Sequence, residues 1–294
     1  MIRLLSIITI AVTLLISCEK ELTYSGKGSA PVLVLNSILV NHEPFVVNIS
    51  RSVFFLSNQG ETSSAIYDAT VTLTNLSTGE VFTLTYGIDG EYTFPFDVTP
   101  NTGYKIVVTH PKYPTISSEL ITVGDIVLDD VDTSSVELNS FERERRSIFK
   151  FNDLPGENKY LVVYQQAIIY PSMMDTIFEN GYSGYSNDAA VDNEAVDVSG
   201  DVSYEPRVFF TDATFANQYK NFTLKNLVYN YGDTTDIIYN YTLLNVTEDT
   251  YKYFKSVPKN MQVSELSDPS KVHTNIVGGF GIFGSISYST IRKY

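Results

Sequence analysis

The chain has 294 residues, a formal net charge of −14 and a single cysteine. An acidic surface repels phosphate backbones and anionic lipid headgroups, so the charge argues against nucleic acid as a partner and against electrostatic docking on a membrane. With only one thiol, no disulfide can form within the chain, so its stability has to come from a buried core.

The first predicted element is a secretory signal over residues 1–17. Arg3 supplies the charged start, and residues 4–16 form an apolar stretch that is too short to cross a bilayer. The sequence Leu-Ile-Ser-Cys18 resembles a bacterial lipobox, in which the thiol is acylated and the chain is cut just before it. A plain signal peptide with a chance cysteine is the alternative. The lipobox predicts that acyl chains on Cys18 anchor the protein in a lipid bilayer.

Residues 18–29 are polar and predict a tether between the lipid and the fold. The chain beyond is rich in Tyr, Phe, Val, Ile and Thr, and period-two patterns alternate with turn residues. The predicted strands are Val32–Val40, Phe45–Ser50, Thr70–Asn75, Val81–Tyr86, Tyr92–Phe96, Tyr104–His110 and Thr115–Val123. Hairpin turns are expected at Ser77-Thr78-Gly79 and Ile88-Asp89-Gly90. This spacing predicts an immunoglobulin-like or transthyretin-like β-sandwich over residues 30–124.

Residues 125–294 predict a second, larger and mainly antiparallel β domain with one short helix. The predicted strands are Ile126–Leu138, Ser147–Asn152, Lys159–Tyr170, Val208–Thr211, Phe222–Tyr229, Ile237–Asn245 and Gly284–Ile291. The second and third of these are expected to pair as a hairpin around Leu154-Pro155-Gly156. The helix is predicted from Thr247 to about Val257, because Thr247 can cap it and two acids follow in the first turn.

A long polar loop is predicted over residues 171–206, and loops of this length tend to be functional or disordered. Its tyrosines beside glycine and serine are typical of adaptable binding surfaces. Its carboxylates are ligands that calcium prefers, although the ordered spacing of a calcium loop is missing. A plain acidic loop, a partner or ligand contact and a cation site are the three alternatives. The candidate contact residues are Tyr182, Tyr185, Asp188, Asp192, Glu194, Asp197 and Tyr204.

The sequence predicts no catalytic residue, no metal site and no cofactor. Gly279–Gly284 satisfies a dinucleotide fingerprint, but a strand rather than a helix is predicted to follow it. We interpret its glycines as structural, with Phe280, Ile282 and Phe283 in the core. The three histidines lack metal-ligand spacing. The alternating charges of Glu142–Arg146 are interpreted as a solvated strand edge or loop.

Four segments together resemble a Bacteroidota family of outer-membrane lipoproteins that is catalogued as a domain of unknown function. The segments are Pro31–Leu39, Asp68–Leu73, Phe151–Tyr160 and Asn275–Gly284. The glycine-aromatic ending is the most specific of them, and the resemblance covers nearly all of the mature chain. It implies a role beside TonB-dependent (SusC-like) outer-membrane transporters and supplies no active site.

We therefore expect an outer-membrane lipoprotein that faces the cell exterior and is a non-catalytic binding or accessory subunit of a TonB-dependent uptake system. The acids in Glu19–Glu21 resemble an export signal to the outer face. One alternative is a structural or adhesive surface lipoprotein that contacts other cells or envelope proteins. Another is a glycan-active enzyme, which would need two carboxylates in one cleft.

Overall fold

The computed structural model describes residues 30–53, 64–170, 175–179, 184–192, 207–229, 236–261 and 271–294. The predicted signal, Cys18 and the tether lie outside these residues. Within the described residues, strands dominate and one α-helix is present. The predicted all-β fold with one short helix is therefore confirmed.

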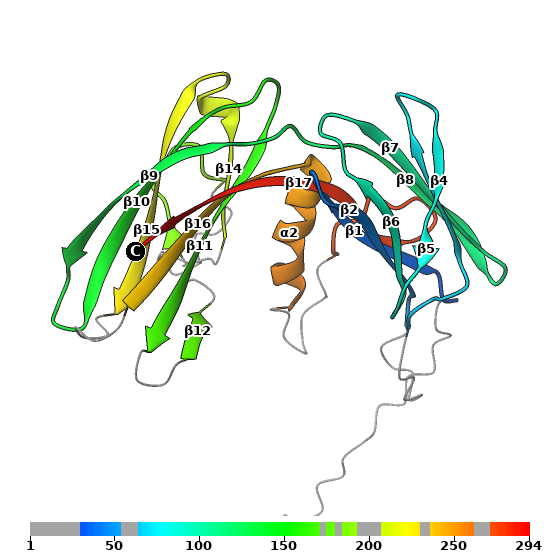
Figure 1. Cartoon of the computed structure of the whole chain (residues 1–294), viewed down its shortest axis with the longest axis horizontal. Coiled ribbons are helices and arrows are strands. Elements are labelled where there is room, and N and C mark those ends of the chain that lie inside the picture. Colours follow the sequence, from blue (N-terminus) through cyan, green and yellow to red (C-terminus); the bar gives the residue numbers. More distant parts are fainter. Residues whose placement is uncertain are drawn as a thin grey trace, which may run out of the picture.

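The N-terminal half is a sandwich of two facing sheets (Figure 1). Its strands are β1 (Leu33–Val40), β2 (Pro44–Arg51), β3 (Thr70–Asn75), β4 (Val81–Thr83), β5 (Thr85–Tyr86), β6 (Glu91–Asp97), β7 (Gly103–His110) and β8 (Tyr113–Ile121). One sheet has the order β4-β3-β7-β8, and the other is the β1-β2-β6-β5 part of a longer sheet. Alternate side chains, among them Leu35, Ile49 and Ile106, are fully buried between the sheets. The period-two pattern of the sequence thus marks the core face of each strand.

Both predicted turns of this sandwich are present. Asp89 (φ 51°) and Gly90 (φ 82°) have the positive φ values that an Asp-Gly hairpin favours. Gly79 also has a positive φ, 74°, between β3 and β4. The single strand predicted over Val81–Tyr86 is wrong, since β4 and β5 belong to different sheets. The buried side chain of Leu84 lies in the core where the chain crosses from one sheet to the other.

The second half is another sandwich with helical elements. Its elements are β9 (Leu128–Glu137), β10 (Glu142–Asn152), β11 (Lys159–Tyr170), β12 (Asp175–Glu179), β13 (Gly184–Tyr185), β14 (Val208–Thr211), η1 (Asp212–Thr214), β15 (Tyr219–Tyr229), β16 (Asp236–Val246) and α2 (Glu248–Met261). A sheet with the order β13-β15-β10-β9 faces β12-β11-β16, to which β14 adds beside β11. Aromatic side chains of the two sheets meet in this core, as where the rings of Phe151 and Tyr160 lie 5.4 Å apart.

The hairpin predicted around Leu154-Pro155-Gly156 is wrong. β10 pairs with β9 and β15, whereas β11 pairs with β12, β14 and β16. The two strands oppose each other across the core, and two opposed strands show the same alternation as two neighbours. The interpretation of Glu142–Arg146 as a strand edge or loop is also wrong. This segment lies in β10, which has a neighbouring strand on each side.

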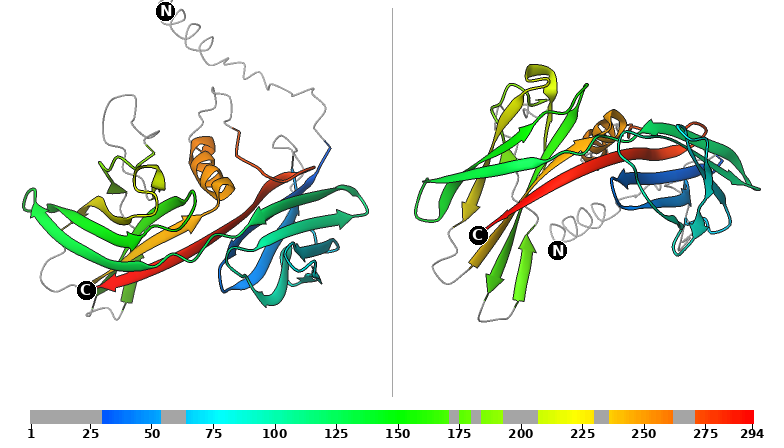
Figure 2. Two further views of the ribbon diagram at one scale, coloured as in Figure 1. Left: turned by 90° about the horizontal axis from the view of Figure 1, so that it is seen from above. Right: turned by 45° about the horizontal axis from the view of Figure 1, so that its top comes forward.

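Strand β17 (Phe280–Lys293) connects the two sandwiches. Its first half runs parallel to β1, and its second half runs antiparallel to β16, with Ile286 in both registers. Figures 1 and 2 show it as one long strand that spans the molecule. The two halves therefore share one nine-stranded sheet. The proposed domain boundary near residue 124 stays a prediction.

The glycine-aromatic segment forms the start of β17. Gly281 has a φ of 107°, and a Cβ there would overlap the carbonyl oxygen of Leu35 on β1. This supports the structural interpretation of the glycines. Ile282 and Phe283 are buried as predicted, but Phe280 is 53% exposed, so its predicted place in the core is wrong. The positive φ at Gly281 falls between Phe280 and the buried pair.

Helix α2 begins directly after Thr247, as predicted, and extends four residues past the predicted end. The carbonyl of Thr247 accepts a hydrogen bond of 2.9 Å from the amide of Tyr251. Tyr251 is buried against Leu161 of β11 and Val246 of β16, on the face of the sheet away from the second core. The helix thus covers the sheet between the two sandwiches (Figure 1). Among the described residues, no helix has the length and apolar character needed to span a bilayer.

Candidate functional site

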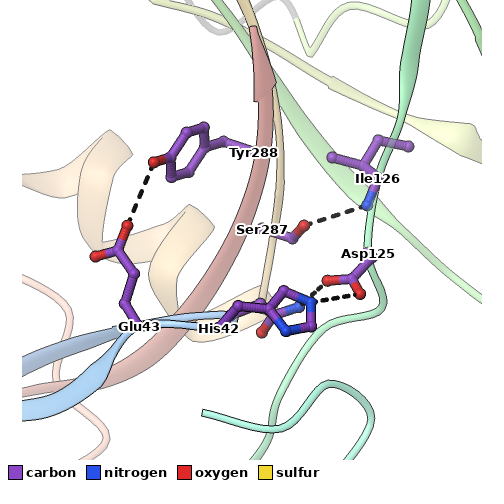
Figure 3. Close-up of a pocket in the computed structure, with 7 residues that line it drawn as sticks. His42, Glu43, Asp125, Ile126, Ser287 and Tyr288 are labelled. Atoms are coloured by element: carbon purple, nitrogen blue, oxygen red, sulfur yellow. Dashed lines mark hydrogen bonds and ion pairs between the residues drawn. The ribbon is translucent and has the colours of Figure 1, made fainter. Parts of the chain in front are cut away.

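A hollow of about 420 Å³ lies where the two sandwiches meet (Figure 3). Three segments contribute to it: the turn after β1, the segment that enters β9, and the middle of β17. The lining residues are Asn41, His42, Glu43, Asp125, Ile126, Ser287 and Tyr288. These residues are distant in the sequence, so the hollow exists only because β17 joins both halves.

His42 and Asp125 form a hydrogen-bonded pair at this hollow, with 2.8 Å between Nε2 and the carboxylate. His42 has a φ of 64°, an uncommon value that points to a specified turn. The side-chain amide of Asn41 donates to the other carboxylate oxygen of Asp125 at 2.8 Å, and this bond orients the Asp125 carboxylate. The side chains of His42 and Asp125 are 67% and 45% exposed, so a ligand in solution can reach both.

The serine hydroxyls of β17 hold the segment that connects the two sandwiches. Ser285, Ser287 and Ser289 each accept a hydrogen bond from a backbone amide of residues 123, 126 and 128, at 3.4, 3.2 and 3.0 Å. The Ser287 hydroxyl is therefore the acceptor for the Ile126 backbone amide. The hollow thus presents an exposed, hydrogen-bonded His–Asp pair beside the segment that connects the two sandwiches.

Glu43 and Tyr288 form the other side of the hollow. The Tyr288 hydroxyl donates to Glu43 at 3.3 Å, and the negative charge of that carboxylate raises the pKa of Tyr288 above its usual value. The hollow thus offers two carboxylates, an imidazole and phenolic and amide groups. Among the described residues, no group of three His, Cys, Asp or Glu side chains is placed to hold a metal ion.

Three of the predicted contact residues of the acidic loop lie in the described residues, and each has a partner in the chain. Tyr185 donates to Glu144 at 2.9 Å, and Asp188 forms an ion pair of 2.8 Å with Lys220. Both members of the Asp188–Lys220 pair are mostly buried. The other four predicted residues, Tyr182, Glu194, Asp197 and Tyr204, lie outside the described residues.

Asp192, the third, ties the loop to helix α2. Lys255 lies 2.6 Å from its carboxylate, and Tyr251 donates to the same group at 3.2 Å. Burial acts to raise the pKa of Asp192, but the hydrogen bond and charge of Lys255 outweigh burial and hold that pKa below its usual value. The prediction of one continuous loop over residues 171–206 is wrong, because β12 and β13 lie within this range and pair with β11 and β15. The contacts of Asp192 anchor the segment after β13, and its role toward a partner stays a prediction.

Sequence reasoning missed the hollow. The positive φ of His42 and its approach to Asp125 leave no mark on the sequence, because the two residues are 83 positions apart. One signal was present: Ser285, Ser287 and Ser289 alternate along a predicted strand, and such a pattern indicates a polar face that contacts other backbone groups.

The fold and the hollow define a class of protein: an all-β protein with two sandwiches that share a bridging strand and form a polar hollow at their junction. The chain belongs to the family described as Domain of unknown function (DUF4249), whose model matches residues 19–292.

No curated protein matches the chain. Among solved structures, a protein of Corynebacterium diphtheriae that is proposed to be membrane anchored is similar at 10% identity with a TM-score of 0.21. That alignment covers 74% of this chain, which spans only 55% of the other chain.

Proposed function

We propose that this protein is a lipid-anchored outer-membrane protein, displayed on the cell exterior, that serves as a non-catalytic binding subunit of a TonB-dependent uptake system. The observation that carries the anchor is the lipobox that ends in Cys18. The family match over residues 19–292 begins one residue later, so the family region corresponds to the predicted mature chain after its lipid-bearing residue.

The junction supports a binding role. His42 and Asp125 are exposed, and Asn41 fixes their geometry, so they offer a preformed polar contact. The Ser287 hydroxyl of the same hollow accepts a hydrogen bond from the Ile126 backbone amide, which holds the connecting segment against β17 beside this contact. The TonB-dependent partner rests on the family resemblance of the sequence.

Two measurements test this proposal. Cys18→Ser should release the protein into the soluble fraction, because the acidic surface gives the membrane no other attraction. Retention of that variant in the membrane would contradict the anchor. In gentle detergent, the wild-type protein should co-purify with a TonB-dependent barrel, and recovery only as a free monomer would contradict the uptake role.

The hollow can be tested in the same pull-down with a matched pair. Asp125→Asn keeps the shape of the side chain but removes the charge that faces His42. Asp129→Asn removes a charge four residues later, where the carboxylate bonds Asn152 at 3.3 Å outside the hollow. If the hollow contacts the barrel, Asp125→Asn should reduce recovery of the partner several-fold and Asp129→Asn should not.

A further inference from the structure

Strand β10 places two arginines on the inward face of the second sandwich. Its register with β15 is unbroken from Asn152 to Glu142, so alternate side chains point to the same side of the sheet along the whole strand. That face carries Phe151 and Phe149 in the core and then continues, two residues at a time, to Arg145 and Arg143. The inner surface therefore changes from aromatic to cationic toward the start of β10.

Three tyrosines of the opposite sheet meet these arginines. They are Tyr164 on β11 and Tyr239 and Tyr241 on β16, all buried. Arg145 donates from Nε to the Tyr241 hydroxyl at 2.8 Å, and its Cζ lies 3.7 Å from the centre of the Tyr239 ring. These two contacts orient the guanidinium and use its Nε. The two terminal nitrogens of the Arg145 guanidinium, Nη1 and Nη2, donate to no described residue.

Neither arginine has a carboxylate partner among the described residues. Arg143 has a buried Nε with no hydrogen-bond acceptor in the same part of the chain. On the opposite face of the same strand, Arg146 pairs with Glu144 at 2.7 Å and Lys150 with Asp132 at 2.5 Å. The chain has 34 acids and 20 basic residues, so acids are not scarce. On the inward face, Glu137 of β9 lies opposite Arg143 in register, and Ser135 lies opposite Arg145. Two cations with one opposed carboxylate among the described residues leave a net positive charge that an anionic ligand can neutralise.

We propose that Arg143 and Arg145 bind the oxyanion group of a small ligand at this end of the second sandwich. A carboxylate, sulfate or phosphate would accept from the open fork of Arg145 and from Arg143, and both arginines are partly exposed, so the ligand can enter from solvent. Burial raises the pKa of Tyr164, which keeps its hydroxyl protonated beside the anion. The site does not depend on the lipid anchor or on the uptake partner.

Sequence reasoning missed this site because Glu142–Arg146 was interpreted as solvated. The signal was the phase of the alternation: when the strand is extended back from Phe149 in steps of two, Arg145 and Arg143 fall on the core face.

The test is titration calorimetry on the full mature chain in detergent, with sulfate, phosphate and acetate as separate probes at constant ionic strength set by chloride. We expect at least one of these oxyanions to bind and to raise the melting temperature, where chloride does not. Tetrahedral probes and the planar acetate distinguish the kind of oxyanion. Failure of all three probes to bind the folded wild-type protein overturns the proposal.

Variants on the two faces of β10 provide the control. Arg145→Gln and Arg143→Gln should each weaken binding at least tenfold, and Arg146→Gln on the outer face should change it less than twofold. Arg143→Gln loses no hydrogen bond to a described residue, so it carries the test if Arg145→Gln does not fold. Equal binding by the folded Arg143→Gln variant, or an equal loss in Arg146→Gln, overturns the proposal.

Discussion

The two sandwiches of this molecule differ in what lies between their sheets. The N-terminal core is mainly aliphatic. The second core is rich in stacked aromatic rings, such as Phe210 and Phe222 at 4.1 Å, and ends in inward arginines. Ligand sites in proteins combine a mostly apolar lining with a few oriented polar groups, and the inner face of the second sandwich has both. The proposed oxyanion site therefore lies in the second sandwich, where the core ends in arginines.

The largest expected effect tests whether the halves are one unit. Gly281→Val places a β-branched residue at a φ of 107° and against the Leu35 carbonyl, so it should destabilise the fold by about 4 kcal/mol or more. Calorimetric melting should show two separate transitions, because β17 loses its pairing with β1 but keeps β16.

The control is Gly79→Val, at a φ of 74° in open space, which should cost only about 1–2 kcal/mol. A single cooperative transition in Gly281→Val would mean that contacts other than β17 unite the halves.

An intermediate effect is expected from a buried Lys–carboxylate ion pair in the second sandwich, compared with an exposed pair in the N-terminal sandwich. Lys220→Met removes the partner of Asp188, and the two side chains are only 14% and 17% exposed. We expect a loss of about 2 kcal/mol in denaturant unfolding, because a mostly buried carboxylate is left unpaired.

Lys105→Met is the matched change in the N-terminal sandwich. The pair it forms with Glu119 is 42% and 57% exposed, so the loss should stay below about 1 kcal/mol. Similar losses in both variants would argue against a special role for buried polar contacts in the second half.

The smallest effect is acid sensitivity. Four carboxyl groups of the second half have a pKa below the usual value: Asp130, Glu144, Asp192 and Glu248. A lowered folded-state pKa adds stability above the unfolded pKa of about 4, and that stability is lost as the pH falls through the folded value. The melting temperature should therefore change little from pH 7 to pH 5 and drop by a few degrees between about pH 5 and pH 3.

Hydrogen exchange at about pH 6 and pH 3, corrected for intrinsic rates, locates this loss. Protection should fall in β10 and β15 before it falls in β7 and β8. Lys255→Met, which removes the main partner of Asp192, should lessen the effect. An equal loss of protection in both sandwiches would contradict the assignment.

The sequence predicted elements well where local chemistry decides them. The Asp89-Gly90 turn follows from its tolerance of positive φ, and the start of α2 follows from Thr247 and the acids after it. Alternation also located nearly every described strand of the N-terminal sandwich, because each of those strands has one buried face.

Prediction failed where partners are distant. The false hairpin at Leu154-Pro155-Gly156 arose because alternation reports a buried face and not the neighbouring strand. The ion pair of Asp188 with Lys220 and the contact of His42 with Asp125 depend on the completed fold. The predicted lipidation of Cys18 rests on the sequence alone, because export signals are local and linear.

The pairing of β1 with β17 has a consequence for the order of folding. One of the first strands to leave a ribosome or a translocon finds its parallel neighbour only after the far end of the chain has emerged. Contacts between such distant segments form slowly, and an unpaired strand edge is open to aggregation until they form. The N-terminal sandwich should thus remain incomplete until β17 has emerged, and the nascent chain should be prone to aggregation up to that point.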